Sequence, residues 1–284
     1  MAAGWTRLGL IAGGGALPVH VTEAVGADGR LGCVIALKGF ANPSDFTAPV
    51  ERAIGQFGHV IKDLRAAECD AVCFAGIVKR PDFASMIPDM EGAKLLPRLV
   101  AAAVRGDDAL LRAVVKAFED EGFAVIGADT LIESLLAPEG ILGSVSADEA
   151  ALQDVAKAME IAAAIGTLDI GQGAVVCEGL VLAVEAQEGT DAMLARVAGL
   201  PADIRGTPDR RRGVLAKCPK PVQERRVDLP VVGVETVERA ARAGLAGIAV
   251  EAGSAFILGH EAVARAADAH GLFVVGVAPR QVRP

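Results

Sequence analysis

The second half of the sequence holds a set of carboxylates, a hydroxyl and a lysine that could act on a phosphate ester. Carboxylates can hold Mg²⁺ or orient a water molecule, and a lysine can neutralise charge on a transferring phosphoryl group. These types therefore indicate hydrolysis of a phosphoanhydride. The alternative is structural, because the threonine or its neighbouring aspartate can instead cap a helix that begins there. The residues are Glu185, Thr190, Asp191, Lys217 and Asp228.

Three glycines, Gly13, Gly14 and Gly15, follow the apolar run Leu8–Ala12. Glycines at such a point let the backbone approach a phosphate, beside the N-terminal amides of a helix. A dinucleotide fingerprint is incomplete here, because Pro18 stands where its third glycine belongs. Lys38 also follows the second apolar run, where an acidic residue would bind a ribose. We therefore expect a phosphate or nucleotide loop rather than an NAD site, with a plain tight turn as the alternative.

A basic pair, Lys79 and Arg80, directly follows the third apolar run within Gly76–Pro81. Ligands of open α/β sheets bind at the carboxyl ends of parallel strands. The pair could therefore hold a phosphoryl oxygen or a sugar hydroxyl, and simple surface basicity is the alternative. Asp107 and Asp108 are expected to cap a helix, with a pair of metal ligands as the alternative.

Other motifs argue against several classes of protein. The four histidines show no H-x-H or H-x-x-x-H spacing, which argues against a zinc hydrolase, and neither a G-x-S-x-G elbow nor a Walker loop occurs. The five cysteines form no C-x-x-C pair, as is typical of reduced thiols inside a cell. No apolar stretch reaches about 18 residues, so we expect a soluble protein.

Composition favours a parallel α/β architecture. Of the 284 residues 52% are hydrophobic but only 4% are aromatic, so Ala, Val, Leu and Ile with 33 glycines must build the core. The net charge of −8 and the scarcity of aromatic rings argue against nucleic-acid binding.

Short apolar runs alternate with helical patterns in the first half of the chain. The stretch Asp107–Glu121 places its apolar residues on one helical stripe, with Asp107 as the expected N-cap. This alternation predicts a mostly parallel, Rossmann-like sheet. The apolar runs are Leu8–Ala12, Cys33–Leu37, Ala71–Ala75 and Phe123–Ala128.

The pattern changes after about Leu136, which predicts an N-terminal domain over residues 1–136, a linker over 137–147 and a C-terminal α/β catalytic domain over 148–284. A capping box from Ser146 to Glu149 is expected to start the first helix of the second domain. A hairpin is expected around Glu178-Gly179, and a strand over Val227–Val232.

The window from Arg205 to Arg226 has a charge of +6, from eight basic and two acidic residues, so the rest of the chain carries −14. Such a local excess suggests contact with an anionic ligand or an anionic surface. A solvated arginine-rich loop is the alternative.

Taken together, several motifs resemble the LpxI family of UDP-2,3-diacylglucosamine pyrophosphatases, which act in lipid A biosynthesis. The resemblance covers nearly the whole chain, and the combination is far more specific than any one motif. The matching segments are Gly9–Gly15 with Leu17-Pro18, Gly76–Pro81, Gly171-Gln172-Gly173, Glu188–Leu194, Arg226–Pro230 and Gly247–Gly253.

The resemblance implies a Rossmann-like domain followed by a second α/β domain. It also implies Mg²⁺-dependent hydrolysis of UDP-2,3-diacylglucosamine to UMP and 2,3-diacylglucosamine 1-phosphate (lipid X), with water attacking the phosphorus on the sugar side. The residues it implies are, for catalysis, Asp228, Asp191, Lys217 and Thr190; for the metal, Asp228 and Asp191; and for the substrate, Gly13, Gly14, Gly15, Lys79 and Arg80.

One departure concerns Val222-Gln223-Glu224, where the family pattern is Gly-Gln-Asp, so a metal role for Glu224 is in doubt. The lipid substrate implies a cytoplasmic enzyme that meets the inner face of a membrane transiently, and a homodimer is possible. Two other functions stay open: a nucleotide-sugar oxidoreductase, disfavoured by Pro18 and Lys38, and a binding module without catalytic activity.

Overall fold

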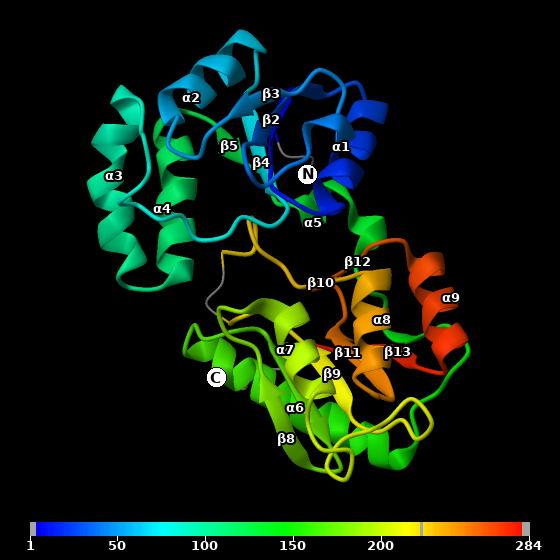
Figure 1. Ribbon diagram of the computed structural model, residues 1–284. Coiled ribbons are helices and arrows are strands. Elements are labelled where there is room, and N and C mark those ends of the chain that lie inside the picture. The colour runs from blue at the N-terminus through cyan, green and yellow to red at the C-terminus, as the bar shows by residue number, and fades with distance from the viewer. Residues whose placement is uncertain (1–3, 222–223, 280–284) are drawn as a thin grey trace. The chain divides into compact units, whose positions relative to one another are not determined.

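The computed structural model describes residues 4–221 and 224–279 (Figure 1). The chain forms two compact units, which are treated separately below. Unit 1 contains residues Met1–Glu133 together with the short segment Glu224–Asp228. Unit 2 contains Ser134–Gln223 and Leu229–Pro284. The polypeptide therefore returns to unit 1 for five residues before it completes unit 2.

Unit 1 is built on a five-stranded sheet in the order β3-β2-β1-β4-β5, and every strand pair in it is parallel. The expected Rossmann-like sheet is confirmed. Because β1 lies between β2 and β4, the strand order reverses at β1, and ligands of such sheets bind beyond the carboxyl ends of the strands at that point. The strands are β1 (Leu8–Ala12), β2 (Leu31–Leu37), β3 (Val50–Arg52), β4 (Ala71–Ala75) and β5 (Ala124–Val125).

Helices α1 to α4 connect the strands of unit 1, as a parallel sheet requires, and α5 follows the last strand. They are α1 (Leu17–Ala27), α2 (Phe57–Ala66), α3 (Met90–Ala103), α4 (Asp107–Asp120) and α5 (Ala128–Leu131), with a short 3₁₀ helix at Pro43–Asp45. A second 3₁₀ helix, Glu133–Leu135, begins at the last residue of unit 1 and continues into unit 2.

Unit 2 has a six-stranded mixed sheet in the order β6-β13-β11-β9-β7-β8. Strands β13, β11 and β9 are parallel, whereas β6, β7 and β8 each run antiparallel to their neighbours. The strands are β6 (Gly140–Leu142), β7 (Gly173–Cys177), β8 (Leu180–Val184), β9 (Val214–Lys217), β11 (Gly247–Glu251) and β13 (Phe273–Val277), and β10 (Val231–Val232) pairs separately with β12 (Phe256–Ile257).

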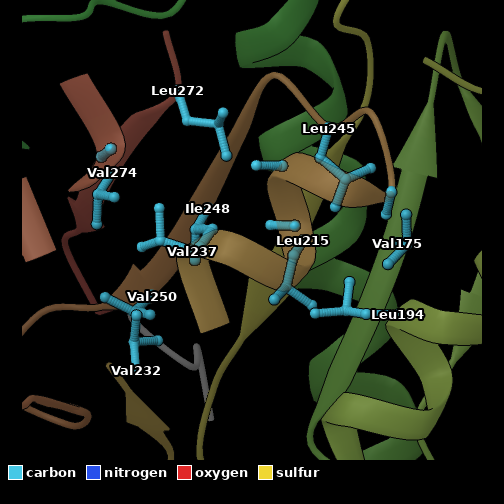
Figure 2. Packing of buried hydrophobic residues seen from close by; sticks show 14 of the residues in the cluster. Val175, Leu194, Leu215, Val232, Val237, Leu245, Ile248, Val250, Leu272 and Val274 are labelled. Carbon is cyan, nitrogen blue, oxygen red and sulfur yellow. The ribbon is translucent and has the colours of Figure 1, made fainter. Parts of the chain in front are cut away.

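Helices cover both faces of this sheet. Figure 2 shows one face, where Leu215 and Ile248 of the sheet pack against Leu194 and Val237 of the covering helices. The other face packs on α6 through small residues such as Ala162. Aliphatic side chains fill the core, as the low aromatic content predicts. The helices are α6 (Glu149–Thr167), α7 (Gly189–Ala198), α8 (Val234–Arg242) and α9 (His260–His270).

Two predicted helix caps are wrong by one or two residues. Gly106 is the N-cap of α4, so Asp107 is the first residue of that helix rather than its cap. Asp148, not Ser146, caps α6, and its side chain accepts a hydrogen bond from the amide of Ala151 at 2.8 Å. A carboxylate nearer to the helix takes the capping position.

Two longer segments also differ from prediction. Residues 137–147, predicted as a linker, include β6, which pairs with β13 because Ile141 and its neighbours extend the sheet. The strand predicted over Val227–Val232 shrinks to Val231–Val232, because the amides of Val227 and Asp228 both donate to the carbonyl of Glu224 and form a turn.

The turn between β1 and α1 approaches the segment after β4 so closely that both need glycine. Gly14 and Ile77 exchange two backbone hydrogen bonds, of 2.9 and 2.8 Å. Gly76 has φ of +94°, and a Cβ there would lie 2.6 Å from the carbonyl oxygen of Gly14. This contact joins the carboxyl ends of β1 and β4.

Substitution of Gly76 by alanine should therefore strain the backbone and push these two segments apart. We expect Gly76→Ala to lower the free energy of unfolding by about 2–5 kcal/mol. Urea denaturation followed by the fluorescence of Trp5, the single tryptophan, measures this in unit 1. Gly26→Ala is the control, because Gly26 lies in α1 with open space around it and should gain up to about 1 kcal/mol. Equal stability of Gly76→Ala and the unchanged protein would contradict the argument.

Candidate active site

Lys217 is a buried cation at the carboxyl end of β9. Its residue exposure is 5%, and it lies on the sheet face that otherwise carries the aliphatic core. Its Nζ donates to the backbone carbonyl of Val231 at 3.1 Å. An ammonium group has three protons, so one is satisfied by this contact and two can serve another acceptor. This position suits a group that neutralises a phosphate.

Glu185, which follows β8, and Thr190 form a hydrogen-bonded pair in the same unit. Thr190 lies in the first turn of α7, and its Oγ1 donates to Oε1 of Glu185 at 2.7 Å. The N-cap of α7 is Glu188, and no side chain caps the helix. The hydroxyl of Thr190 is thus not used for helix capping, which was the structural alternative for this residue.

Strand pairing places Glu185 and Lys217 on one face of the sheet. Gly173 pairs directly with Lys217, and its carbonyl accepts the amide of Glu185 at 2.8 Å. Residues that oppose each other across antiparallel strands point to the same face. The three residues therefore form one row across β9, β7 and the end of β8, with glycine in the middle.

Asp191 is the more exposed member of the predicted set. Its side chain is 58% exposed, and its Oδ1 lies 3.2 Å from Nε of Arg239 on α8. Arg239 also bonds Glu235, and that hydrogen bond, with the negative charge of Asp191, raises the pKa of the guanidinium. Asp191 on α7 is thus paired with a residue of α8.

Asp228 belongs to unit 1 and ends the turn that begins at Glu224. The amide of Glu224 donates to Oδ1 of Asp108 at 2.8 Å, and Asp108 also binds Arg112. The side chain of Val227 packs against the core of unit 1. These contacts fix the turn on both sides and thereby set the position of Asp228.

A bidentate ion pair closes the same turn. Arg226 donates from Nε and Nη2 to the two carboxylate oxygens of Glu224, each at 2.8 Å, and from Nη1 to Glu119 at 2.9 Å. The guanidinium lowers the pKa of Glu224, and the pKa of Arg226 is raised in return. Both oxygens of Glu224 are taken by Arg226, which explains the carboxylate at this position without a metal. Val222 and Gln223, the other two residues of the departure, lie outside the described residues.

Two backbone amides of the turn Gly13–Gly15 donate hydrogen bonds within the protein. The amide of Gly13 donates to Ala75 and that of Gly14 to Ile77. Ligand contact by Gly13, Gly14 and Gly15 stays a prediction. Such a contact must use other polar groups of the turn, such as the amide of Gly15. Nearby, Arg80 donates to the carbonyl of Ala103 at 2.6 Å and to Asp107, while Lys79 is exposed.

The basic window is largely engaged in contacts within the protein. Arg211 donates to the carbonyl of Ala241, Arg212 pairs with Glu178 at 2.7 Å, and Lys220 pairs with Asp169 at 2.6 Å. Arg212 precedes β9 and contacts the β7–β8 turn, whereas Lys217 ends β9, so they lie at opposite ends of that strand. Arg212 therefore lies away from Lys217.

The predicted site residues are divided between the two units. Thr190, Asp191 and Lys217 lie in unit 2, and Asp228, Gly13–Gly15, Lys79 and Arg80 lie in unit 1. Asp108 and Arg226, which hold the turn of Asp228, were missed as site residues. A signal was present, because each is a charged residue in or beside a segment that was singled out.

A metal ion bound to the described residues would have few protein ligands. Among residues 4–221 and 224–279, no three His, Cys, Asp or Glu side chains gather round one point. Mg²⁺ is commonly held by one or two carboxylates, with phosphate oxygens and water completing its octahedron. The carboxylates present fit that mode of binding and not a cage made entirely of protein ligands.

Comparison with known proteins agrees with these features. A family model described as the LpxI N-terminal domain matches residues 7–135, and one described as the LpxI C-terminal domain matches residues 138–275. A protein of Caulobacter vibrioides named UDP-2,3-diacylglucosamine pyrophosphatase LpxI is 58% identical to this chain over 276 residues. That alignment covers 97% of this chain and 99% of the relative.

The ion pair of Arg226 should make stability depend on pH in a defined way. The folded-state pKa of Glu224 is depressed, so its pairing stabilises the fold above the ordinary carboxyl pKa of about 4.3 and is lost as the pH falls below it. We expect Arg226→Met to lower the free energy of unfolding by about 1–2 kcal/mol at pH 7, and by less at pH 4. Denaturant titrations between these pH values measure the difference.

Arg265→Met provides the control, since Arg265 pairs with Glu261 on the exposed face of α9. Its stability should follow that of the unchanged protein at every pH. If the loss of unfolding free energy in Arg226→Met stays constant or grows as the pH falls, the role given to Glu224 is contradicted.

Proposed function

The chain belongs to the LpxI family, and on that premise we propose that it hydrolyses the diphosphate of UDP-2,3-diacylglucosamine to UMP and 2,3-diacylglucosamine 1-phosphate. One observation carries the proposal, namely the match to a named pyrophosphatase over nearly the full length of both chains. The buried ammonium of Lys217 supports it, because the substrate carries a charged diphosphate.

Lys217 and Asp228 would have different roles in this reaction. Lys217 donates its remaining protons to a phosphoryl oxygen and offsets the negative charge that develops there. Asp228 orients the attacking water and accepts its proton, which a carboxylate on a fixed turn can do. Thr190 and Asp191 complete the proposed catalytic set, and Lys79 and Arg80 are proposed substrate contacts.

Mg²⁺ is the proposed cofactor, with Asp228 and Asp191 as its proposed ligands. When bound, it would neutralise the diphosphate and polarise the phosphorus–oxygen bonds. Asp191 would bind it through Oδ2 or leave its contact with Arg239, since Oδ1 lies beside that guanidinium.

The acyl chains of the substrate place the reaction at a membrane surface, and we propose transient contact with the cytoplasmic face of the inner membrane. No helix in residues 4–221 and 224–279 is both long and apolar enough to span a bilayer. Exposed apolar side chains on and beside α3 support surface contact. They are Ile87, Met90 and Val104. A homodimer is proposed as well, and sedimentation analysis would measure it.

Release of UMP from UDP-2,3-diacylglucosamine is the direct test of the proposed function. We expect UMP and 2,3-diacylglucosamine 1-phosphate in equal amounts, loss of activity with EDTA and recovery with Mg²⁺. In ¹⁸O-labelled water the label should enter the lipid product, because attack occurs at the phosphorus on the sugar side. With substrate in vesicles, anionic lipid should raise the rate. No UMP release, with nicotinamide bound instead, would favour the oxidoreductase.

Asp228 should be essential for turnover and dispensable for folding. We expect Asp228→Ala and the isosteric Asp228→Asn to lower kcat by about a hundredfold or more, because the loss falls mainly on the transition state. Substrate binding should persist through Lys217. Asp28→Asn, a substitution at an exposed residue after α1, is the control. Normal turnover combined with about 1 kcal/mol of lost stability would reduce Asp228 to a turn-forming residue.

A further inference from the structure

Glu185 has a buried carboxylate oxygen that the protein leaves without a partner. The residue is 5% exposed, and while Oε1 accepts from Thr190, Oε2 has no hydrogen-bond partner in the part of the chain that the structure describes. An unpaired buried oxygen of a carboxylate is costly, so such atoms in native proteins usually have a partner that the protein itself does not supply. Oε2 is therefore a candidate acceptor for a ligand.

Two glycines make the space that this carboxylate occupies. A Cβ at Gly173 would lie 2.6 Å from Oε2 of Glu185, and a Cβ at Gly171 would lie 2.1 Å from its backbone oxygen. Neither glycine has a positive φ, so the backbone conformation does not demand glycine. Both glycines of the segment Gly171-Gln172-Gly173 thus leave space for Glu185. The carboxylate lies over Gly173, the residue of β7 that pairs with Lys217.

The same contact fixes the polarity of Thr190. A hydroxyl has a single proton, and a carboxylate has none to give. Because the proton of Thr190 is directed to Oε1 of Glu185, the hydroxyl oxygen offers only lone pairs to a ligand. Thr190 in this state cannot donate to a phosphoryl oxygen, but it can accept a hydrogen bond.

We propose that Glu185 and Thr190 form a two-acceptor subsite for an O–H donor, in which Glu185 lies in the same row across the sheet as Lys217 and the subsite is separate from the phosphate contact of that lysine. Glu185 acts as a positioning residue for Thr190 and as an acceptor through Oε2. The donor is either a hydroxyl of the substrate or a water molecule, including one carried by the divalent cation. This inference rests on the proposed function and specifies which partner Thr190 binds.

The substitution Glu185→Gln tests the subsite because it keeps the shape and reverses one polarity. The amide oxygen can still accept from Thr190, whereas the amide nitrogen would replace Oε2 with a donor. We expect kcat/KM to fall about tenfold to a hundredfold, the scale of a lost hydrogen bond to a charged group. Glu188→Gln is the matched control, since Glu188 lies three residues away at the surface and pairs with Arg196, and it should keep full activity.

Two further variants separate the subsite from a merely structural role. Thr190→Ser keeps the hydroxyl and should retain most activity, whereas Thr190→Val should lose about as much as Glu185→Gln. The double variant should lose little more than either one, because the two acceptors hold one donor and the loss of either acceptor already releases it. Additive losses, or a loss of activity explained by a lower Tm in each variant, would overturn the proposal.

Binding measurements distinguish the two donors. If the donor is a substrate hydroxyl, Glu185→Gln should weaken binding of UDP-2,3-diacylglucosamine in EDTA and leave Mn²⁺ affinity, measured by electron paramagnetic resonance, unchanged. If the donor is water of the cation, Mn²⁺ affinity should fall and binding in EDTA should persist. If the two measurements and kcat all stay unchanged, the subsite does not exist, while UMP release by the unchanged protein would leave the proposed function standing.

Discussion

A charged side chain stays buried only where polar groups replace the water it has lost, and this constraint governs the end of β9. Glu185 and Lys217 are each 5% exposed on a sheet face that is otherwise aliphatic. The carbonyl of Val231 takes one ammonium proton, and Thr190 satisfies one carboxylate oxygen. The compensation that the described residues supply is therefore partial. A ligand with both an anionic oxygen and an O–H donor would complete it, so burial and binding are coupled.

Unit 1 meets the same constraint with a closed network instead. Asp108, only 7% exposed, accepts the amide of Glu224 and pairs with Arg112. Glu224 in turn uses both oxygens on Arg226, which also binds Glu119. In this set of charges each member has partners within the unit, and such a network rigidifies its segment. This network therefore fixes the position of Asp228, and its charges are compensated without a ligand.

The parts of the fold that depend on local sequence were predictable, and those that depend on distant partners were not. Strands β1 and β4 match the predicted runs Leu8–Ala12 and Ala71–Ala75 because continuous apolar segments flanked by glycine leave few alternatives. The mostly apolar composition of Val227–Val232 did not indicate that contacts of Asp108 and Arg226 with Glu224 would place its first residues in a turn of unit 1. For Glu185 the residue type was visible, but its burial depends on Gly173 pairing with both neighbouring strands.

Two glycine-rich motifs in this chain serve two different needs of the fold itself, apart from any contact with a ligand. Position 76 requires glycine because its φ is positive and because a side chain would meet the backbone of Gly14. The close approach lets the amides of Gly13 and Gly14 donate to the carbonyls of Ala75 and Ile77. Gly173 has an ordinary conformation and makes room for a carboxylate. A glycine of this kind therefore marks a position where another group approaches the backbone closely, and the neighbouring atoms identify that group. By that criterion, Gly171-Gln172-Gly173 marks the close approach of Glu185, and the proposed anion contact of unit 2 rests on the ammonium of Lys217 instead.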